Sequence, residues 1–91
     1  MVKLGDVTTF PDAKPDKTQV LKIGEEAMEV FSAWENWRPF PNVKGHYKKH
    51  LLDECADVIQ ATCNLISALG EDDFTPYMEA CKLRNKKKGR L

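Results

Sequence analysis

The sequence predicts an all-α domain of three main helices in an antiparallel bundle that is completed by homo-oligomerisation. Apolar residues recur at helical spacing in three stretches, which proline- and glycine-containing segments separate. Convincing strand alternation is missing, apart from a few residues of the N-terminal arm. The chain has 91 residues, enough for one domain. A chain this short buries a limited fraction of its surface and often gains stability from association with further copies.

The single domain, residues 1–91, is predicted to divide into an arm, a helical core and a tail. Residues 1–17 form an irregular arm, residues 18–88 the helical core and residues 89–91 the tail. The arm assignment rests on breakers of regular structure among scattered charges. These breakers are Gly5, Pro11 and Pro15.

The first predicted helix runs from a cap at Thr18 to about Trp37. The segment 38–41, Arg-Pro-Phe-Pro, ends it, because proline disfavours helix in the residue before it. Residues 42–45 then complete a short loop.

The second predicted helix covers His46–Leu69, and Gly70 fits a left-handed cap at its C-terminus. A short connector over residues 71–74 follows. Thr75-Pro76 resembles a capping residue followed by proline at the first helical position, so a third helix is expected from there to about Lys87.

The apolar residues of the first helix cover an arc of roughly 200°, wider than one packing seam needs. This width predicts a second buried surface, either within the chain or with another copy. The second helix has an apolar face and an opposite polar face, on which Glu54 and Asp57 are about 60° apart. The arc of the first helix consists of Val20, Leu21, Ile23, Ala27, Met28, Val30, Phe31, Trp34 and Trp37.

Two matched acidic pairs carry the strongest functional signal: Glu26-x-x-Glu29 on the first helix and Glu54-x-x-Asp57 on the second. A spacing of three places both carboxylates of a pair on the same side of one turn. Hard cations such as Mg²⁺ prefer oxygen ligands. A solvated charged face is the alternative interpretation of any single pair. The recurrence on two adjacent helices, with few bases at helical spacing from the second pair, favours a metal site.

Composition limits the remaining classes of function. Lys and Arg number 14, as do Asp and Glu, so the net charge is zero, which argues against a general nucleic-acid-binding protein. Six basic residues nevertheless gather in the segment 82–90. No segment has the apolar length of a membrane span or of a signal core. The three cysteines match no metal or redox motif and are expected as buried thiols in a cytoplasmic protein; they are Cys55, Cys63 and Cys81.

The segments 22–30, Lys-Ile-Gly-Glu-Glu-Ala-Met-Glu-Val, and 52–59, Leu-Asp-Glu-Cys-Ala-Asp-Val-Ile, together resemble the signature of MazG-like all-α nucleoside triphosphate pyrophosphohydrolases. That signature is Glu-Glu-x-x-Glu on one helix and Glu-x-x-Asp on the next. The spacer here, residues 30–53, has 24 residues. The resemblance covers residues 18–90, and the basic Gly-Arg end is similar to that of compact, phage-type members.

The resemblance implies that Glu26, Glu29, Glu54 and Asp57 coordinate Mg²⁺, with Mn²⁺ as an alternative, and that the metal binds a nucleoside triphosphate. The implied reaction converts a ribo- or deoxyribonucleoside triphosphate and water to the monophosphate and pyrophosphate. Glu25 is implied as an outer carboxylate that orients a ligand or accepts the proton of the attacking water. A solvated surface glutamate is the alternative for Glu25.

Other side chains are candidates for substrate contacts. Trp37 is a candidate for stacking on a base, and Asn64 for contact with a sugar or phosphate. His46 and His50 form a His-x-x-x-His pair that is either a transition-metal site or two partly exposed side chains. The basic end offers phosphate contacts, with a dipole-complementing helix end as the alternative. The candidates there are Lys82, Arg84, Lys87 and Arg90.

Two rival functions remain open at this level. One is a nucleotide-binding module with little or no catalysis. The other is a helical interaction module whose acidic faces keep it in solution and whose basic tail binds nucleic acid. The expected partners of the favoured hydrolase are its nucleotide substrate and further copies of itself, as a homodimer or a dimer of dimers, with neither a membrane nor nucleic acid.

Overall fold

The computed structural model describes residues 1–41 and 45–91, and within these residues it contains three α-helices and no strand. The helices are α1 (Lys17–Trp37), α2 (His46–Ala68) and α3 (Thr75–Lys87). The all-α class and the three predicted helices are therefore confirmed. The predicted loop over residues 42–44 lies outside the described residues.

The residue that caps the N-terminus of α1 is not the predicted one. Asp16, not Thr18, is the N-cap, and its Oδ1 accepts a hydrogen bond from the backbone N–H of Gln19 at 3.0 Å. A carboxylate at this position satisfies one of the unpaired amide donors of the first turn. The predicted end at Trp37 is confirmed.

The turn between α2 and α3 is fixed by Gly70, whose φ of 89° is the left-handed conformation expected of it. Its N–H donates to the Ser67 carbonyl at 2.9 Å. The predicted cap of α3 is wrong by one residue, because Phe74 is the N-cap and has no capping side chain. Asp73 takes over this task by accepting a hydrogen bond from the Thr75 N–H at 3.0 Å. The hydrogen bonds from Thr75, first from its side chain and then from its backbone, lower the pKa of Asp73 below its usual range.

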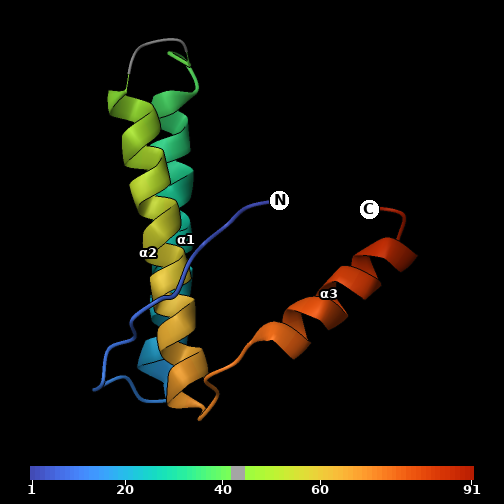
Figure 1. Cartoon of the computed structure of the whole chain (residues 1–91). Helices are drawn as coiled ribbons and strands as arrows, with labels where there is room; N and C mark the ends of the chain where they lie inside the picture. The colour runs from blue at the N-terminus through green and yellow to red at the C-terminus, as the bar shows by residue number, and fades with distance from the viewer. Residues whose placement is uncertain (42–44) are drawn as a thin grey trace.

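Helices α1 and α2 form an antiparallel hairpin, with the two helices side by side along their length (Figure 1). Helix α3 extends away from this hairpin and makes no close backbone contact with either helix among the described residues. The Cα radius of gyration is 15.4 Å. A compact domain of this length would have a radius of about 12 Å. Within one chain, therefore, the bundle consists of α1 and α2 alone.

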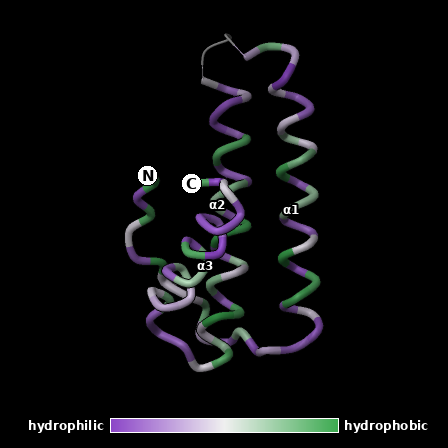
Figure 2. The backbone as a smooth tube through the Cα atoms, turned by 90° about the vertical axis from the view of Figure 1, so that its right-hand side faces the viewer, coloured by the Kyte–Doolittle hydropathy of each residue, from purple (hydrophilic) through white to green (hydrophobic). Residues whose placement is uncertain are grey.

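Helices α1 and α2 bury few residues completely, and these are small or polar. The buried residues of the described chain are Ala33 on α1 and Ala61 on α2, together with two polar residues, Glu26 on α1 and Asn64 on α2. Figure 2 shows hydrophobic positions recurring along both helices. Many of them are not covered within the chain. Large apolar side chains of α1 that remain exposed are Val20, Leu21, Met28, Phe31 and Trp34.

None of the described helices combines the length and the apolar character needed to cross a membrane. The three cysteines carry free thiols and are half-buried rather than buried as predicted.

Candidate metal centre

Three carboxylates from α1 and α2 meet in the contact between the helices. One oxygen from each of Glu26, Glu29 and Glu54 lies within 4.8 Å of the others. Glu26 is buried, Glu54 is half-buried and Glu29 is exposed. The polar side of α2 therefore faces α1, which the sequence pattern required if the two acidic pairs were to meet. Three of the four predicted metal ligands are brought together.

Two oxygens of this cluster are sealed from solvent and have no hydrogen-bond donor among the described residues: Glu26 Oε2 and Glu54 Oε2. A buried carboxylate oxygen without a donor is costly, and two of them beside each other also repel. A divalent cation would supply the missing positive charge to both. Because hard cations take carboxylate oxygens as ligands, this donor set fits Mg²⁺ or Mn²⁺.

Among the described residues, Lys22 of α1 is the lysine that pairs with the cluster. Lys22 Nζ lies 3.0 Å from Glu26 Oε1 and 3.8 Å from Glu25 Oε2. The hydrogen bond to Glu26 and the charge of that carboxylate raise the pKa of Lys22. One lysine does not neutralise three carboxylates, so the cluster keeps an excess of negative charge. Glu25 itself is exposed and directed to Lys22, outside the cluster.

The neighbouring carboxylates change the pKa of Glu29. A hydrogen bond between its protonated form and Glu54, followed by the negative charge of Glu26, raises the pKa of Glu29 above its ordinary value of 4.5. Proton and metal are alternative ways to remove the repulsion. A cation that bound here would compete with the proton on Glu29.

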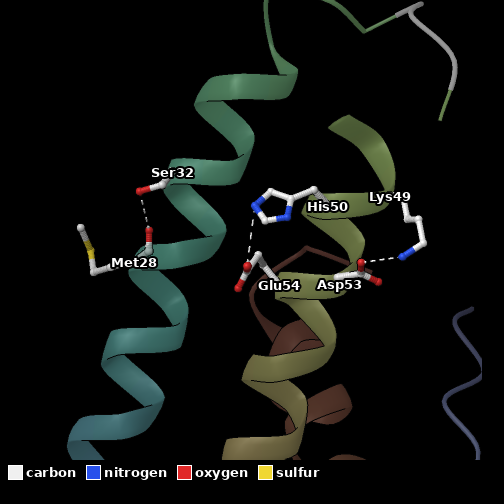
Figure 3. A network of polar contacts seen from close by, with 6 residues as sticks. All are labelled: Met28, Ser32, Lys49, His50, Asp53 and Glu54. Atoms are coloured by element: carbon white, nitrogen blue, oxygen red, sulfur yellow. Dashed lines mark hydrogen bonds and ion pairs between the residues drawn. The ribbon is translucent and has the colours of Figure 1, made fainter. Parts of the chain in front are cut away.

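The two histidines of the predicted pair have different neighbours in the structure. His50 and Glu54 lie on the side of α2 that faces α1, with His50 Nε2 3.7 Å from Glu54 Oε1 (Figure 3). The neighbouring pair Lys49 and Asp53 points to another side, with Nζ and Oδ2 2.8 Å apart. His46 instead packs edge-on against Tyr47, with ring centroids 5.3 Å apart. His46 is not part of the carboxylate cluster, and the hypothesis of a two-histidine metal site gains no support.

The fourth predicted ligand, Asp57, lies in the wall of a cavity that adjoins Glu26. The cavity has a volume of about 390 Å³ and is bounded by α1, α2 and the N-terminal arm. Asn64, a predicted substrate contact, is in the same wall and only 3% exposed. The lining residues are Phe10, Gln19, Lys22, Glu26, Asp57, Gln60, Ala61 and Asn64.

The N-terminal arm reaches this cavity because α2 holds it through three polar contacts. The Phe10 N–H donates to Asn64 Oδ1 at 3.0 Å, and Gln60 Nε2 donates to the Thr8 carbonyl at 3.0 Å. Thr9 adds a contact between its hydroxyl and that of Ser67 at 3.1 Å. The arm, with Phe10, and Gln60 of α2 are parts of the site that were not predicted from the sequence. The available signal was Gln60 and Asn64, one turn apart on the same polar face as Asp57.

The remaining predicted substrate contacts lie elsewhere within one chain. Trp37 is at the far end of α1 and does not line the cavity; its indole N–H is buried and has no acceptor among the described residues. The basic candidates lie on α3 and the tail, away from the hairpin (Figure 1). Their role in substrate binding stays a prediction; they are Lys82, Arg84, Lys87 and Arg90, of which Arg90 donates to Asn85 Oδ1 at 3.1 Å.

Comparisons of the chain with protein-family models, with curated proteins and with solved structures gave no match. The function therefore has to be inferred from the residues of the site.

Proposed function

We propose that the protein is a Mg²⁺-dependent nucleoside triphosphate pyrophosphohydrolase, in which Glu26, Glu29, Glu54 and Asp57 hold the metal. The observation that carries the proposal is that Glu26 on α1 and Glu54 on α2 each have a sealed oxygen without a donor among the described residues, in a cluster whose carboxylates approach within 4.8 Å. Solvated surface acids would not be placed in this way, since burial of an unpaired charge is destabilising. The double acidic motif of the sequence supplies the reaction class.

Bound Mg²⁺ would neutralise phosphate charge, polarise the scissile phosphoryl group and lower the pKa of the attacking water. The four carboxylates would position the metal, and the cavity beside Glu26 would receive the nucleoside. Water would attack the α-phosphorus, the bond from that phosphorus to the bridging oxygen would break, and pyrophosphate would leave. Glu25 is the proposed proton acceptor, since it is exposed, adjoins Glu26 in sequence and shares Lys22 with it.

We also propose that the active form is a homo-oligomer, a homodimer or a dimer of dimers, in the cytoplasm. The apolar arc of α1 supports association, because Phe31 and Met28 are 51% and 63% exposed within one chain. An exposed apolar surface of this kind is typical of an interface. A second copy would also offer its α3 to complete the bundle and bring basic side chains to the phosphates.

The proposal is tested by pyrophosphate release from a panel of ribo- and deoxyribonucleoside triphosphates, with Mg²⁺ or with a chelator. Glu54→Gln should abolish release, while Asp53→Asn should retain it, because Asp53 adjoins Glu54 but pairs with Lys49 on another side of α2. Binding of nucleotide without turnover by the unmodified protein would favour the binding module. Absence of both, with salt-sensitive binding to DNA or RNA, would favour the helical interaction module.

A further inference from the structure

The cavity beside Glu26 is lined by carboxamide side chains whose orientation is fixed by backbone groups. Asn64 Oδ1 accepts from the Phe10 N–H at 3.0 Å and from Gln60 Nε2 at 2.9 Å. A backbone N–H only donates, so the oxygen of Asn64 must point to it and the amide nitrogen must point the other way. Asn64 is 3% exposed, and its Nδ2 donates to no group among the described residues. Asn64 Nδ2 is not among the sealed polar atoms without a partner, so it keeps contact with solvent and can donate to a ligand that enters the cavity.

The side-chain amide of Gln60 is also fixed, but through its nitrogen rather than its oxygen. Its Nε2 donates to the Thr8 carbonyl at 3.0 Å and to Asn64 Oδ1 at 2.9 Å, which uses both of its hydrogens. What Gln60 can offer a ligand is therefore its Oε1, an acceptor. Gln60 and Asn64 both line this cavity, and the groups they leave free are one acceptor and one donor.

Gln19 of α1 adds a second acceptor. Its Nε2 donates to the Ala61 carbonyl at 2.9 Å, so its Oε1 is directed away from that carbonyl. Phe10 adds a ring to the lining, and its backbone is held by Asn64. An aromatic ring beside a fixed set of donors and acceptors is the arrangement that holds a flat heterocycle by stacking and reads its polar edge.

We propose that this cavity binds the base of the nucleotide and selects bases that carry an exocyclic amino group, cytosine and adenine, over their keto counterparts uracil and hypoxanthine. The two hydrogens of the amino group would donate to Gln60 Oε1 and Gln19 Oε1, and the adjacent ring nitrogen would accept from Asn64 Nδ2. A keto base offers a carbonyl oxygen to two acceptors and a ring N–H to a donor, so like groups face each other. This inference rests on the proposed function, in which the cavity receives the nucleoside.

The test compares substrates that differ only in the amino group: dCTP with dUTP, and ATP with ITP, each with Mg²⁺. We expect kcat/KM to be about tenfold or more higher for the amino member of each pair, the range for one or two mispaired buried hydrogen bonds. Asn64→Asp keeps an oxygen for the Phe10 N–H but replaces the donor with an acceptor. This variant should lower kcat/KM for dCTP and raise that for dUTP, whose ring N–H can donate to the new carboxylate.

Asp53→Asn is the matched control, since Asp53 pairs with Lys49 on another side of α2 and does not line the cavity. It should leave the dCTP to dUTP ratio unchanged. Equal kcat/KM for the two members of both pairs in the unmodified protein would overturn the base assignment and leave the proposed hydrolysis intact.

Binding of dCMP and dUMP without metal, measured by calorimetry, separates the base assignment from catalysis. Tighter binding of dCMP in a protein that hydrolyses no triphosphate would support the cavity assignment and refute the proposed function. Equal or absent binding of both monophosphates would overturn the cavity assignment. This measurement uses the unmodified protein, so the test does not depend on the folding of a variant.

Discussion

Replacing Glu54 with glutamine should stabilise the metal-free protein and remove its response to Mg²⁺. The carboxylate oxygens of Glu26 and Glu54 approach within 4.8 Å, and the two side chains are 10% and 15% exposed. Two like charges at that separation repel by about 3 kcal/mol at an effective dielectric constant of about 20. Glutamine abolishes this repulsion and can donate to Glu26 Oε2, which lacks a donor.

We expect a net gain of about 1–2 kcal/mol in the free energy of unfolding, since residual solvent weakens the repulsion. For a domain of this size that is a rise of about 5–15 °C in Tm. In the unmodified protein, Mg²⁺ at one hundred times its Kd should add about 2.7 kcal/mol, and Glu54→Gln should lose most of this gain.

Thermal melts followed by circular dichroism, with chelator and with Mg²⁺, measure both effects. Asp53→Asn is the control, because Asp53 forms an exposed pair with Lys49 and contributes little to stability. A Glu54→Gln protein that melts lower than the unmodified protein in chelator, or that keeps the full Mg²⁺ shift, would refute the assignment of the cluster as a metal centre.

Three further substitutions test other parts of the structure. Because the pKa of Glu29 is raised in the folded state, its contribution to stability is present below about pH 4.5 and is lost as the pH rises through the raised value. When stability is measured against pH in the presence of chelator, Glu29→Gln should flatten this part of the profile. An unchanged profile would contradict the coupling of Glu29 to Glu54 and Glu26. Gly24→Ala should stabilise α1 by up to about 1 kcal/mol in denaturant unfolding, since the added Cβ meets no atom within 4 Å; a loss of stability would mean that a further copy approaches this position. Phe31→Asp should yield monomers in sedimentation, whereas an unchanged mass would exclude the α1 arc from the interface.

The helices could be predicted from the sequence because their signals are local. Gly70 ends α2 as its position predicted, and Trp37 ends α1 immediately before the Arg-Pro segment. Caps were less well predicted, since Asp16 and Thr18 are both good capping residues within one turn. The local pattern does not decide which of two such neighbours captures the first free amide.

The site was predicted in part, for a similar reason. A spacing of three places Glu26 and Glu29 on one side of α1, so their meeting with Glu54 required one further condition, the rotation of α2. The contacts of the arm have no local signal. Phe10 and Asn64 are 54 positions apart, and a hydrogen bond over that separation follows from the assembled fold rather than from any pattern within a helix.

We expect cation binding and association between copies to reinforce each other, because both would offset unfavourable features of the same α1–α2 packing. The hairpin places polar residues such as Glu26 and Asn64 in the α1–α2 contact and leaves apolar side chains such as Phe31 exposed. Repulsion in the cluster is expected to loosen the hairpin, and a loosened hairpin would present a poorly defined apolar surface to a second copy. Bound Mg²⁺ would remove the repulsion and should therefore tighten association, since a ligand that favours one state also favours whatever else binds that state. Sedimentation over a range of protein concentrations should give a lower dissociation constant with Mg²⁺ than with chelator in the unmodified protein, and the same constant under both conditions in Glu54→Gln. Equal constants in the unmodified protein would show that the cluster and the apolar arc act independently.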